Sequence, residues 1–308
     1  MKAAICKEYG PPEVIEIKDV QKPTPKDNEI LIRIITTTVQ TGDCKIRNFI
    51  GVAKQSNYNP ILQFIVRLVM GYNRPKTPIF GMELFGKIES VGKKVRKHKI
   101  GDEVIVNPDM KMGAHAEYIV WREGKLIVNK PENITPEQAA ALPFGGTTAL
   151  YFLKKANIQK GQTILINGAS GAVGSSAVQL AKYFGAIVTA VCGTNNIELV
   201  KSIGADFVID YTKENIDRDN SQYDIIFDAV EKLPKNKCSN ILKQNGKYIT
   251  VAKGMVLGKQ EDLIFLSTLA EQNKFLPIID KCYKLDEIVE AYKYVETGHK
   301  KGNIVIKI

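Results

Sequence analysis

Short apolar runs, separated by turns rich in glycine, proline and charged residues, fill the first 130 residues of the chain. Runs of four to eight residues bounded by such turns are typical of β-strands, and many in succession indicate a barrel-like β domain. We therefore expect strands at residues 30–35, 85–92, 102–106, 118–120 and 125–128.

The pattern changes near Thr135, a candidate N-cap whose capping box is completed by Gln138, with Pro136 in the first helical turn. An alanine-rich helix is predicted to follow, and a second helix to open at residues 145–151. Beyond residue 162 strands and helices alternate. Strands are predicted at residues 163–167, 187–191, 207–210, 225–228 and 247–251, and helices at residues 173–184 and 197–203.

Nearly continuous apolar strands that alternate with helices predict a doubly wound parallel sheet. The last residues, 302–308, form another β-branched run, which we expect to return to the first domain. The fold class is therefore α/β. We place one domain at residues 1–122 and 279–308 and a second domain at residues 123–278.

A glycine loop follows the first strand of the second domain. Residues 164–166 run into Asn-Gly-Ala-Ser-Gly-Ala-Val-Gly at residues 167–174, and a helix follows. A strand, a glycine-rich turn and a helix are what a dinucleotide pyrophosphate requires, because the backbone N–H groups must approach its phosphates closely. Ala169 occupies the place of the first glycine of the usual pattern, with Gly171 and Gly174 as the second and third. A glycine-rich turn without a ligand is the alternative.

The next strand bears on the choice between NADPH and NADH. NAD-selective sites carry an Asp or Glu near its end, which binds the ribose hydroxyls. Here the strand ends in Cys-Gly-Thr-Asn-Asn at residues 192–196, and the first carboxylate is Glu198, already on the helix. The nearest cation is Lys201. We expect NADPH, with NADH the less favoured cofactor.

Composition narrows the function classes. The net charge is +10, but lysines are spread along all 308 residues, so we expect no nucleic-acid partner. The five cysteines are scattered, which argues against a disulfide framework or a cysteine-rich zinc module. The most apolar run, residues 61–70, is too short to span a bilayer, and no signal peptide is visible. We expect a cytoplasmic protein with no membrane partner.

The glycine loop, the order of the domains, and the motifs Gly-Met-Glu-Leu-Phe-Gly at residues 81–86 and Gly-Ala-His-Ala-Glu-Tyr at residues 113–118 resemble the medium-chain dehydrogenase/reductase superfamily. Within it, the chain resembles the zinc-independent quinone oxidoreductase-like branch, along essentially its whole length. The resemblance implies a GroES-like β-barrel catalytic domain, a Rossmann domain and assembly as a homodimer.

Zinc-dependent members of the superfamily bind their catalytic metal with a Cys, a His and a second Cys or Asp. The resemblance places these ligands at Gln40, at Met82 and near Phe144. These residue types cannot supply the thiolate and imidazole ligands that zinc requires, and the four-cysteine structural lobe is also missing. We therefore expect no zinc, and hydride transfer in which protein donors polarise the acceptor oxygen.

The zinc-independent branch usually carries Asn-Pro-x-Asp-x-x-x-Arg in this region. Here residues 40–47 retain Asp43 and Arg47, and Gln40 replaces the Asn. The resemblance makes these three the candidate catalytic residues, since a Gln side chain can still donate a hydrogen bond. A structural ion pair between Asp43 and Arg47, one helical turn apart, is the alternative. We interpret His115 as structural.

The resemblance also implies the cofactor contacts. Thr148 and the loop lie by the pyrophosphate, Gly193 and Thr194 by the adenosine ribose, and Tyr211 by the adenine, while Lys45 approaches from the catalytic domain. The nicotinamide side is lined from two further strand ends. The full expected set is Lys45, Thr148, Ala169, Ser170, Gly171, Ala172, Val173, Gly174, Gly193, Thr194, Tyr211, Ala229, Val230, Val251 and Ala252.

Three functions remain open at this point. The first is NADPH-dependent reduction of a quinone, an enone or a related carbonyl, that is, a small electrophilic substrate. The second is a zinc-independent NAD(P)-dependent alcohol dehydrogenase. The third is a non-catalytic protein that binds NADPH.

Overall fold

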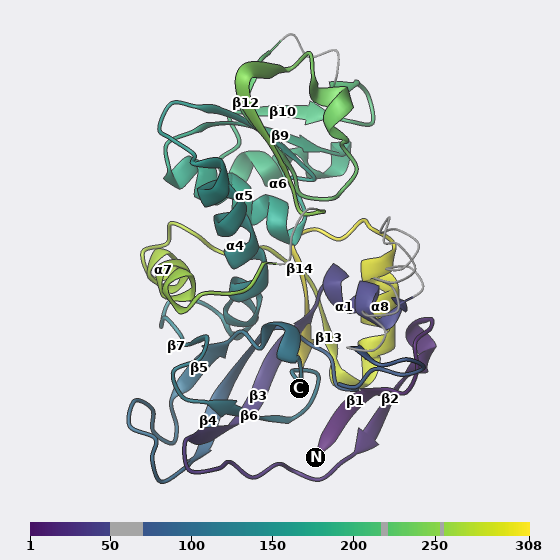
Figure 1. Ribbon diagram of the computed structural model, residues 1–308, viewed down its shortest axis with the longest axis vertical. Helices are drawn as coiled ribbons and strands as arrows, with labels where there is room; N and C mark the ends of the chain where they lie inside the picture. Colours follow the sequence, from purple (N-terminus) through teal and green to yellow (C-terminus); the bar gives the residue numbers. More distant parts are fainter. Residues whose placement is uncertain (50–69, 217–220, 253–255) are drawn as a thin grey trace. The chain divides into compact units, whose positions relative to one another are not determined.

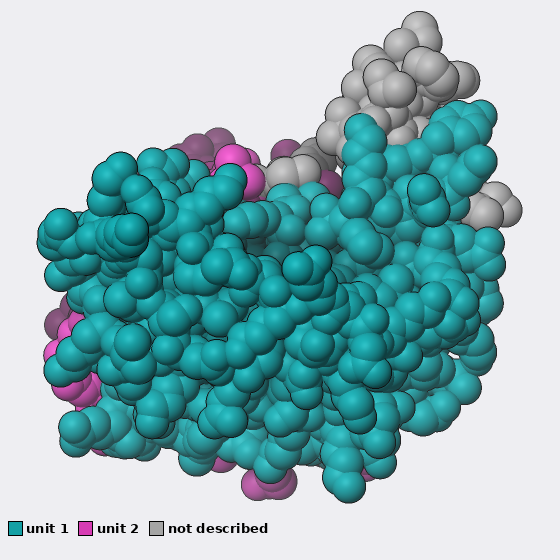
Figure 2. All heavy atoms as spheres, turned by 90° about the horizontal axis from the view of Figure 1, so that it is seen from below, with its two compact units in different colours: residues 1–143, 279–308 teal, residues 144–278 magenta. Residues whose placement is uncertain are grey.

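The structure, a computed structural model, describes residues 1–49, 70–216, 221–252 and 256–308 (Figure 1). The chain forms two compact units, coloured separately in Figure 2. Unit 1 comprises Met1–Pro143 and Ile279–Ile308, and unit 2 comprises Phe144–Ile278. Residues 61–69 of the apolar run considered above lie outside the described residues.

Unit 1 is rich in β-structure. Among its described residues, β1 (Lys2–Cys6) and β2 (Ile15–Asp19) form an antiparallel pair. The other described strands of unit 1 form a seven-stranded sheet. That sheet has the order β13-β14-β3-β4-β5-β7, and β6 pairs with β3. Its strands are β3 (Glu29–Val39), β4 (Leu84–Val91), β5 (Glu103–Val106), β6 (Tyr118–Arg122), β7 (Ile127–Asn129), β13 (Ile279–Lys284) and β14 (Asn303–Lys307).

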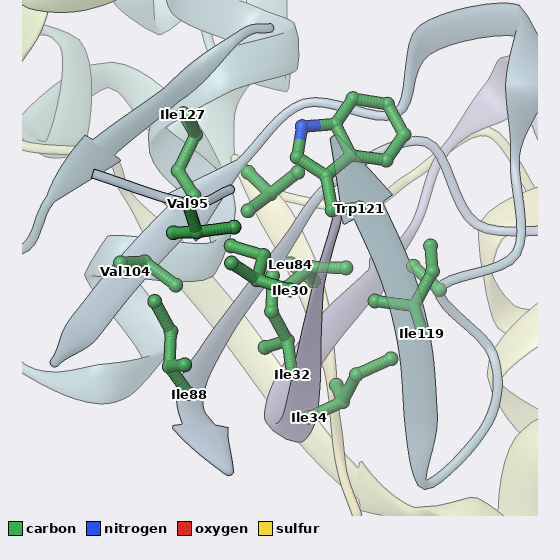
Figure 3. Packing of buried hydrophobic residues seen from close by; sticks show 12 residues of the cluster. Ile30, Ile32, Ile34, Leu84, Ile88, Val95, Val104, Ile119, Trp121 and Ile127 are labelled. Atoms are coloured by element: carbon green, nitrogen blue, oxygen red, sulfur yellow. The ribbon is translucent and has the colours of Figure 1, made fainter. Parts of the chain in front are cut away.

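Strand β3 organises unit 1, because it is long enough for different partners along its length. Its first half pairs with β6, its second half with β14, and β4 lies along its other side. Figure 1 shows the C-terminal strand β14, in yellow, inside this largely N-terminal sheet. Apolar residues on one face of β3 and its neighbours, including Ile30, Ile32, Leu84 and Trp121, form a buried core (Figure 3).

Helix α4 (Pro136–Ala156) begins where the sequence predicted. The capping box is present: the Thr135 N–H donates to Gln138 Oε1 over 3.0 Å, and the Gln138 N–H donates to Thr135 Oγ1 over 3.2 Å. The expected second helix at residues 145–151 is instead a continuation of α4. The glycines there allow close packing, because a Cβ on Gly145 would lie 2.7 Å from the Ala172 carbonyl oxygen.

Unit 2 contains a five-stranded parallel sheet in the order β10-β9-β8-β11-β12 within the described residues. The strands are β8 (Thr163–Asn167), β9 (Ile187–Cys192), β10 (Phe207–Asp210), β11 (Tyr223–Asp228) and β12 (Leu242–Thr250). Strand order reverses between β8 and β11, so the crevice beyond their carboxyl ends is the switch point at which such sheets bind ligands.

The remaining helices are short. Unit 1 contains α1 (Thr41–Arg47) and α8 (Ile288–Glu296), and unit 2 contains α5 (Ala172–Tyr183), α6 (Ile197–Ser202) and α7 (Gln260–Glu271). Single 3₁₀ turns occur at Pro12–Val14, Asp109–Lys111, Thr194–Asn196, Lys235–Cys238 and Leu285–Glu287. The glycine loop precedes and begins α5. Helix α1 carries the candidate catalytic residues Asp43 and Arg47, and Gln40 is its N-cap.

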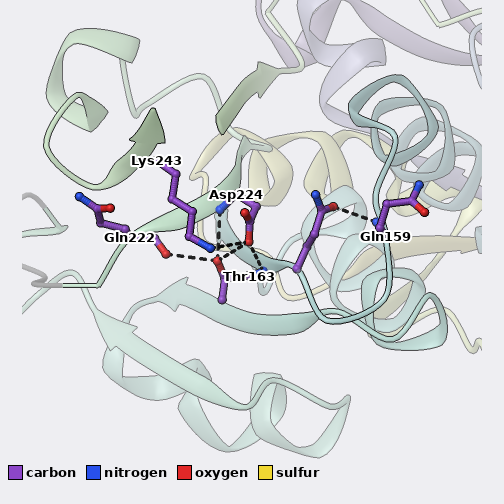
Figure 4. Close-up of polar contacts among 6 residues, drawn as sticks. Gln159, Thr163, Gln222, Asp224 and Lys243 are labelled. Carbon is purple, nitrogen blue, oxygen red and sulfur yellow. Dashed lines mark hydrogen bonds and ion pairs between the residues drawn. The ribbon is translucent and has the colours of Figure 1, made fainter. Parts of the chain in front are cut away.

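Asp224 connects three strands of unit 2 at their amino ends through hydrogen bonds and an ion pair (Figure 4). Its Oδ2 accepts hydrogen bonds from the Thr163 N–H, over 2.8 Å, and from Thr163 Oγ1, over 2.9 Å. Lys243 Nζ lies 2.8 Å from the same oxygen. These contacts join β8, β11 and β12 at the edge opposite the switch point, so they stabilise the sheet without occupying the ligand crevice.

The first boundary between the units lies later than the sequence analysis placed it. Residues 123–143 were assigned to the second domain, but unit 1 extends to Pro143. The reason is local pairing, since β7 adds to the sheet of unit 1 through β5. Single strands this short carry too little pattern to show which sheet they join.

Candidate functional site: a glycine loop in unit 2 and a buried network in unit 1

The loop after β8 is closed by its own backbone. The N–H groups of Gly168 and Ala169 both donate to the carbonyl of Val191, at the end of the neighbouring strand β9, over 3.1 and 3.0 Å. Gly171 N–H returns to the Gly168 carbonyl over 3.1 Å, and Gly168 has φ +76°. The turn is therefore tight, and α5 starts directly beside the end of β8.

The glycines of the loop differ in what a side chain would meet. A Cβ on Gly174 would lie 2.1 Å from the Gly168 carbonyl oxygen, so glycine is needed there for the helix to pack on the loop. Apart from adjacent residues, a Cβ on Gly171 would have one neighbour within 4 Å among the described residues, the Gly168 oxygen at 3.6 Å. Protein packing leaves room at Gly171, which is where a pyrophosphate needs close approach of the backbone. The loop therefore fits a dinucleotide.

Beyond β9, the loop expected to face the adenosine ribose contains Gly193 and Thr194. Thr194 Oγ1 donates to Asp210 Oδ2 over 2.5 Å, and a Cβ on Gly193 would lie 3.4 Å from the Tyr211 hydroxyl. Tyr211 is 57% exposed, so its ring is available to a ligand. The structure thus brings Gly193, Thr194 and Tyr211 close together, and their contact with the adenosine stays a prediction.

Asp210 is a carboxylate in this region that the sequence reading missed, because it comes from the next strand, β10. Its Oδ1 accepts the N–H and Oγ1 of Thr212, and Lys213 Nζ lies 3.7 Å from Oδ2. The bonds from Thr194 and Thr212 hold the pKa of Asp210 below its usual range. With its oxygens bound in this way, Asp210 differs from the ribose-binding carboxylate of NAD-selective sites.

The nicotinamide-side positions lie at the carboxyl ends of β11 and β12. Ala229 N–H donates to the Asn167 carbonyl over 3.1 Å, and Val251 N–H to the Asp228 carbonyl over 3.1 Å. Buried Asp228 accepts the Asn167 side-chain amide over 2.9 Å. The same edge therefore holds Ala229, Val230, Val251, Ala252 and the loop residues Ala169, Ser170, Ala172 and Val173. Half-buried Thr148 lies on α4, three residues after Gly145.

In unit 1, Gln40 is the centre of a buried polar network. Its Nε2 lies within hydrogen-bond distance of Glu83 Oε1 (2.7 Å), Asn303 Oδ1 (2.9 Å) and Thr38 Oγ1 (3.1 Å). Thr38 Oγ1 also donates to Glu83 Oε1. The amide of Gln40 is 1% exposed, and its donors serve these internal acceptors. The sequence reading missed Glu83 and Asn303, although Glu83 belongs to the Gly-Met-Glu motif.

Half-buried Lys300 lies near the same network. Burial lowers the pKa of Lys300 to about 8, and the charge of Glu83 opposes that shift. Its Nζ donates to the Gly302 carbonyl over 2.6 Å. A cationic side chain, three residues before Asn303 in the sequence, therefore lies near the buried Glu83 carboxylate.

Asp43 and Arg47 do not form the ion pair considered as an alternative. Asp43 Oδ2 accepts the Gln40 N–H over 2.8 Å, and Oδ1 accepts the Gly81 N–H over 3.1 Å. Arg47 instead pairs with Glu296 on α8 and donates to the Gly10 carbonyl over 2.7 Å. Both side chains are fully buried, and burial raises the pKa of the Asp43 carboxyl. Each one anchors α1 to a different part of unit 1.

His115 is buried beside this helix, as the structural interpretation expected. Its Nε2 lies 2.9 Å from the Thr38 carbonyl oxygen, and its Nδ1 lies 3.5 Å from the Tyr292 hydroxyl. Because a carbonyl only accepts, the proton is assigned to Nε2. Burial lowers the pKa of His115, with Asp43 opposing, so the ring is neutral at pH 7. Lys45, also on α1, is half-buried in unit 1.

The chemistry of the residues at the zinc-ligand positions remains that of an amide, a thioether and a phenyl ring. Met82 is buried, and Gln40 directs N–H groups at its neighbours. Within the described part of the chain, no three His, Cys, Asp or Glu side chains come together in a way that could hold a metal ion. All five cysteines are free thiols, and only Cys282 is exposed.

Comparison with protein families gives three matches along the chain. Residues 26–158 match the family model of the alcohol dehydrogenase GroES-like domain, and residues 172–276 and 252–306 match two models described as zinc-binding dehydrogenase. In the described residues, no helix is long and apolar enough to cross a membrane.

Among similar proteins is the 2-methylene-furan-3-one reductase of Solanum lycopersicum, 33% identical over 99% of this chain and 79% of that protein. The NADPH-dependent alkenal/one oxidoreductase of Arabidopsis thaliana, a chloroplastic protein, is 32% identical with the same coverage. The quinone oxidoreductase from Coxiella burnetii has a similar structure, with a TM-score of 0.82 and 25% identity, covering 100% of this chain and 99% of that chain.

Proposed function

Because the chain belongs to the medium-chain dehydrogenase/reductase superfamily, in its zinc-independent quinone oxidoreductase-like branch, we propose that it transfers a hydride from NADPH to a quinone, an enone or a related carbonyl. It is an oxidoreductase with a GroES-like unit and a Rossmann unit. The relatives named for alkenal/one and quinone reduction support the substrate class.

The observation that carries this proposal is the contrast between Gly174 and Gly171. Gly174 is required by packing, whereas Gly171 faces space that the described part of the chain does not fill. That space lies at the switch point of a parallel sheet, at the start of a 12-residue helix whose N–H groups favour an anion. As the N-cap of α5, residue 171 could equally be Ser, Thr, Asn or Asp, so helix capping alone does not require the second glycine.

The bound nicotinamide would supply the hydride, and the chain supplies binding and orientation. In unit 2, the loop from Ala169 to Gly174 holds the pyrophosphate, and Tyr211 covers the adenine beside Gly193. Thr148 lies near the pyrophosphate, and the small apolar residues Ala229, Val230, Val251 and Ala252 line the nicotinamide side, where they exclude water from the reacting carbon. The approach of Lys45 to the cofactor stays a prediction from the family resemblance.

In unit 1, we propose that Gln40, Asp43 and Arg47 act by position. All three are at most 1% exposed, and their polar atoms bond to Glu83, Asn303, Gly81 and Glu296. They fasten α1 at both of its ends, and hydride transfer requires that the protein hold its reacting groups in a fixed arrangement. Direct contact of Gln40 with the substrate oxygen stays a prediction.

We propose that the reaction needs no zinc, because the amide of Gln40 and the thioether of Met82 are poor substitutes for imidazole and thiolate. The preference for NADPH is supported by the loop after β9. Its Thr194 hydroxyl is bound to Asp210, and both oxygens of Asp210 already accept hydrogen bonds from threonine hydroxyls, unlike a carboxylate held open for a ribose 2′-hydroxyl.

The test is calorimetric titration of the metal-free protein with NADPH and with NADH, followed by NADPH oxidation with quinones, alkenals and simple alcohols. Tight NADPH binding and turnover of the electrophiles are the expected results. Turnover of alcohols alone would replace the proposal by a zinc-independent alcohol dehydrogenase. Binding without any turnover would leave a non-catalytic NADPH-binding protein, and a requirement for added zinc would refute the metal-free reaction.

We propose a cytoplasmic location and a homodimer as well, on the sequence and on the family resemblance. Several relatives are named as chloroplastic or mitochondrial proteins, so the location needs its own measurement. Cell fractionation tests the location, and recovery of the protein in an organelle would contradict the proposal. Analytical ultracentrifugation tests the assembly, and a monomeric mass would contradict the homodimer.

A further inference from the structure

Ser170 and Asn196 connect the two loops at the cofactor edge of unit 2. Asn196 Nδ2 donates a hydrogen bond to Ser170 Oγ over 3.1 Å, across a sequence separation of 26 residues. Ser170 belongs to the glycine loop after β8, and Asn196 ends the 3₁₀ turn after β9. The contact therefore lies between the loop that fits the pyrophosphate and the loop expected at the adenosine ribose.

The direction of this bond fixes the polarity of the serine. A carboxamide nitrogen only donates, so Ser170 Oγ must accept, and its single hydroxyl hydrogen remains unused by Asn196. Among the described residues, the Ser170 hydroxyl has no other side-chain or backbone partner. The hydroxyl of Thr194, two residues before Asn196 in the same 3₁₀ turn, is different, since its hydrogen goes to Asp210 Oδ2.

Among the described residues, the position of Asn196 leaves one of its polar atoms buried and unpaired, which is unfavourable for stability. Its carbonyl oxygen Oδ1 is buried without a hydrogen-bond partner in the described structure, and its backbone N–H donates to the Gly193 carbonyl over 2.9 Å. A buried polar atom without a partner lowers stability, so it is an arrangement that folding alone does not favour. The hydrogen bond from Nδ2 to Ser170 Oγ is the favourable interaction that the Asn196 side chain makes in this position.

We propose that Asn196 is a positioning residue for dinucleotide binding, which orients the Ser170 hydroxyl so that its hydrogen is donated to a pyrophosphate oxygen. The inference rests on the proposed NADPH-dependent function. A hydroxyl that donates to a phosphate oxyanion makes a charge-assisted bond, stronger than one between neutral groups. Asn196 itself touches neither phosphate, and it acts through Ser170.

The test is a double-mutant cycle with the dissociation constant of the nucleotide as its readout. Ser170→Ala and Asn196→Ala are each expected to weaken binding of NADPH and of NADH by about tenfold, the value of one hydrogen bond to a charged group. Both nucleotides carry the pyrophosphate, so the factor is the same for each. The double variant is expected to bind as Ser170→Ala does, because Asn196 acts through the serine.

Asn196→Asp sharpens the test. A carboxylate of the same shape accepts the Ser170 hydrogen and turns the donor away from the phosphate, so binding falls further than in Asn196→Ala. Asn195→Asp adds the same charge one residue earlier and is the matched control for repulsion. Asn245→Ala, at the other edge of the sheet, is the control for loss of an amide.

The melting temperature without nucleotide separates positioning from folding. Asn196→Ala removes a buried unpaired oxygen, so its melting temperature is expected to stay level or rise. Additive losses in the double variant, unchanged binding by Asn196→Ala, or a loss confined to NADPH would each overturn the proposal, the last by assigning the serine to the 2′-phosphate. Failure of the unmodified protein to bind either nucleotide would instead refute the proposed function.

Discussion

The side-chain amides of Gln40 and Asn303 are hydrogen-bonded to each other, from Nε2 to Oδ1 over 2.9 Å, although 263 residues separate them in the sequence. Gln40 caps α1 after strand β3, and Asn303 begins strand β14, which pairs with β3. The bond therefore joins the N-terminal and C-terminal segments from which unit 1 is built.

Gln40→Met is expected to lower the free energy of unfolding by about 1–3 kcal/mol, because buried acceptors on Glu83 and Asn303 each lose the hydrogen bond that Gln40 donates. Asn303→Ala removes one of those acceptors and is expected to cost about 1 kcal/mol. The two losses are expected to be non-additive by at least about 0.5 kcal/mol in a double-mutant cycle from urea denaturation. Strictly additive losses would mean that the two amides do not interact.

Glu296→Gln is expected to destabilise the protein by about 3–5 kcal/mol, because it leaves the fully buried guanidinium of Arg47 without its counter-charge. The Glu296 side chain is 33% exposed and can be hydrated when Arg47 is removed, so Arg47→Met is expected to cost less, about 1–3 kcal/mol. Thermal unfolding of the two variants measures the difference. If both variants keep full stability while Arg47→Met alone loses kcat, then Arg47 is a catalytic residue and not an anchor.

Stability is expected to fall as the pH drops from about 7 to about 5, in part through His115. Burial lowers the pKa of His115, so the unfolded chain binds the proton first, and the contribution of His115 is lost as the pH falls below the unfolded value near 6.5. The buried Asp43 carboxyl has a raised pKa and acts with the opposite sign on further acidification.

The His115→Gln variant isolates the histidine contribution, since a Gln amide can still donate to the Thr38 carbonyl. Its stability relative to the unmodified protein is expected to improve with decreasing pH across this window. Parallel stability curves for the two proteins would show that His115 does not titrate in this way.

Gly174→Ala and Gly171→Ala form a matched pair. The first is expected to lower the free energy of unfolding by about 1–3 kcal/mol, because its Cβ would overlap the Gly168 carbonyl oxygen. The second has an extended φ of −78° and open space, so its stability is expected to change by less than about 1 kcal/mol. Its affinity for NADPH is nevertheless expected to fall about tenfold or more, because the Cβ separates the backbone from the pyrophosphate.

Calorimetry with NADPH, together with thermal unfolding of each variant, measures both effects. A Gly171→Ala variant that binds NADPH as tightly as the unmodified protein would contradict the assignment of the loop to the pyrophosphate.

The alternating part of the fold was predictable because its signals are local. The strands of unit 2 are nearly continuous apolar runs, and the predicted segments at residues 163–167 and 207–210 coincide with β8 and β10. The capping box at Thr135 was also correctly predicted. The continuation of α4 through Gly145 was not, because its cause is a close contact with Ala172, distant in the sequence.

The same distinction between local and long-range signals applies to the candidate site. The glycine loop could be read from spacing alone, since each of its positions depends on the adjacent strand and helix. The partners of Gln40 could not, because Glu83 and Asn303 reach it only through the pairing of β3 with β4 and β14. For the same reason, Asp210 was found beside Thr194 only once β10 lay next to β9.

The open space at Gly171 has a consequence for how the chain changes over generations. Selection for folding protects Gly174, whereas only continued use of the nucleotide protects Gly171. In a lineage that abandoned its cofactor, residue 171 would drift to alanine or serine long before residue 174 changed. The residues at positions 171 and 174 of a descendant sequence therefore indicate whether that protein still binds the nucleotide.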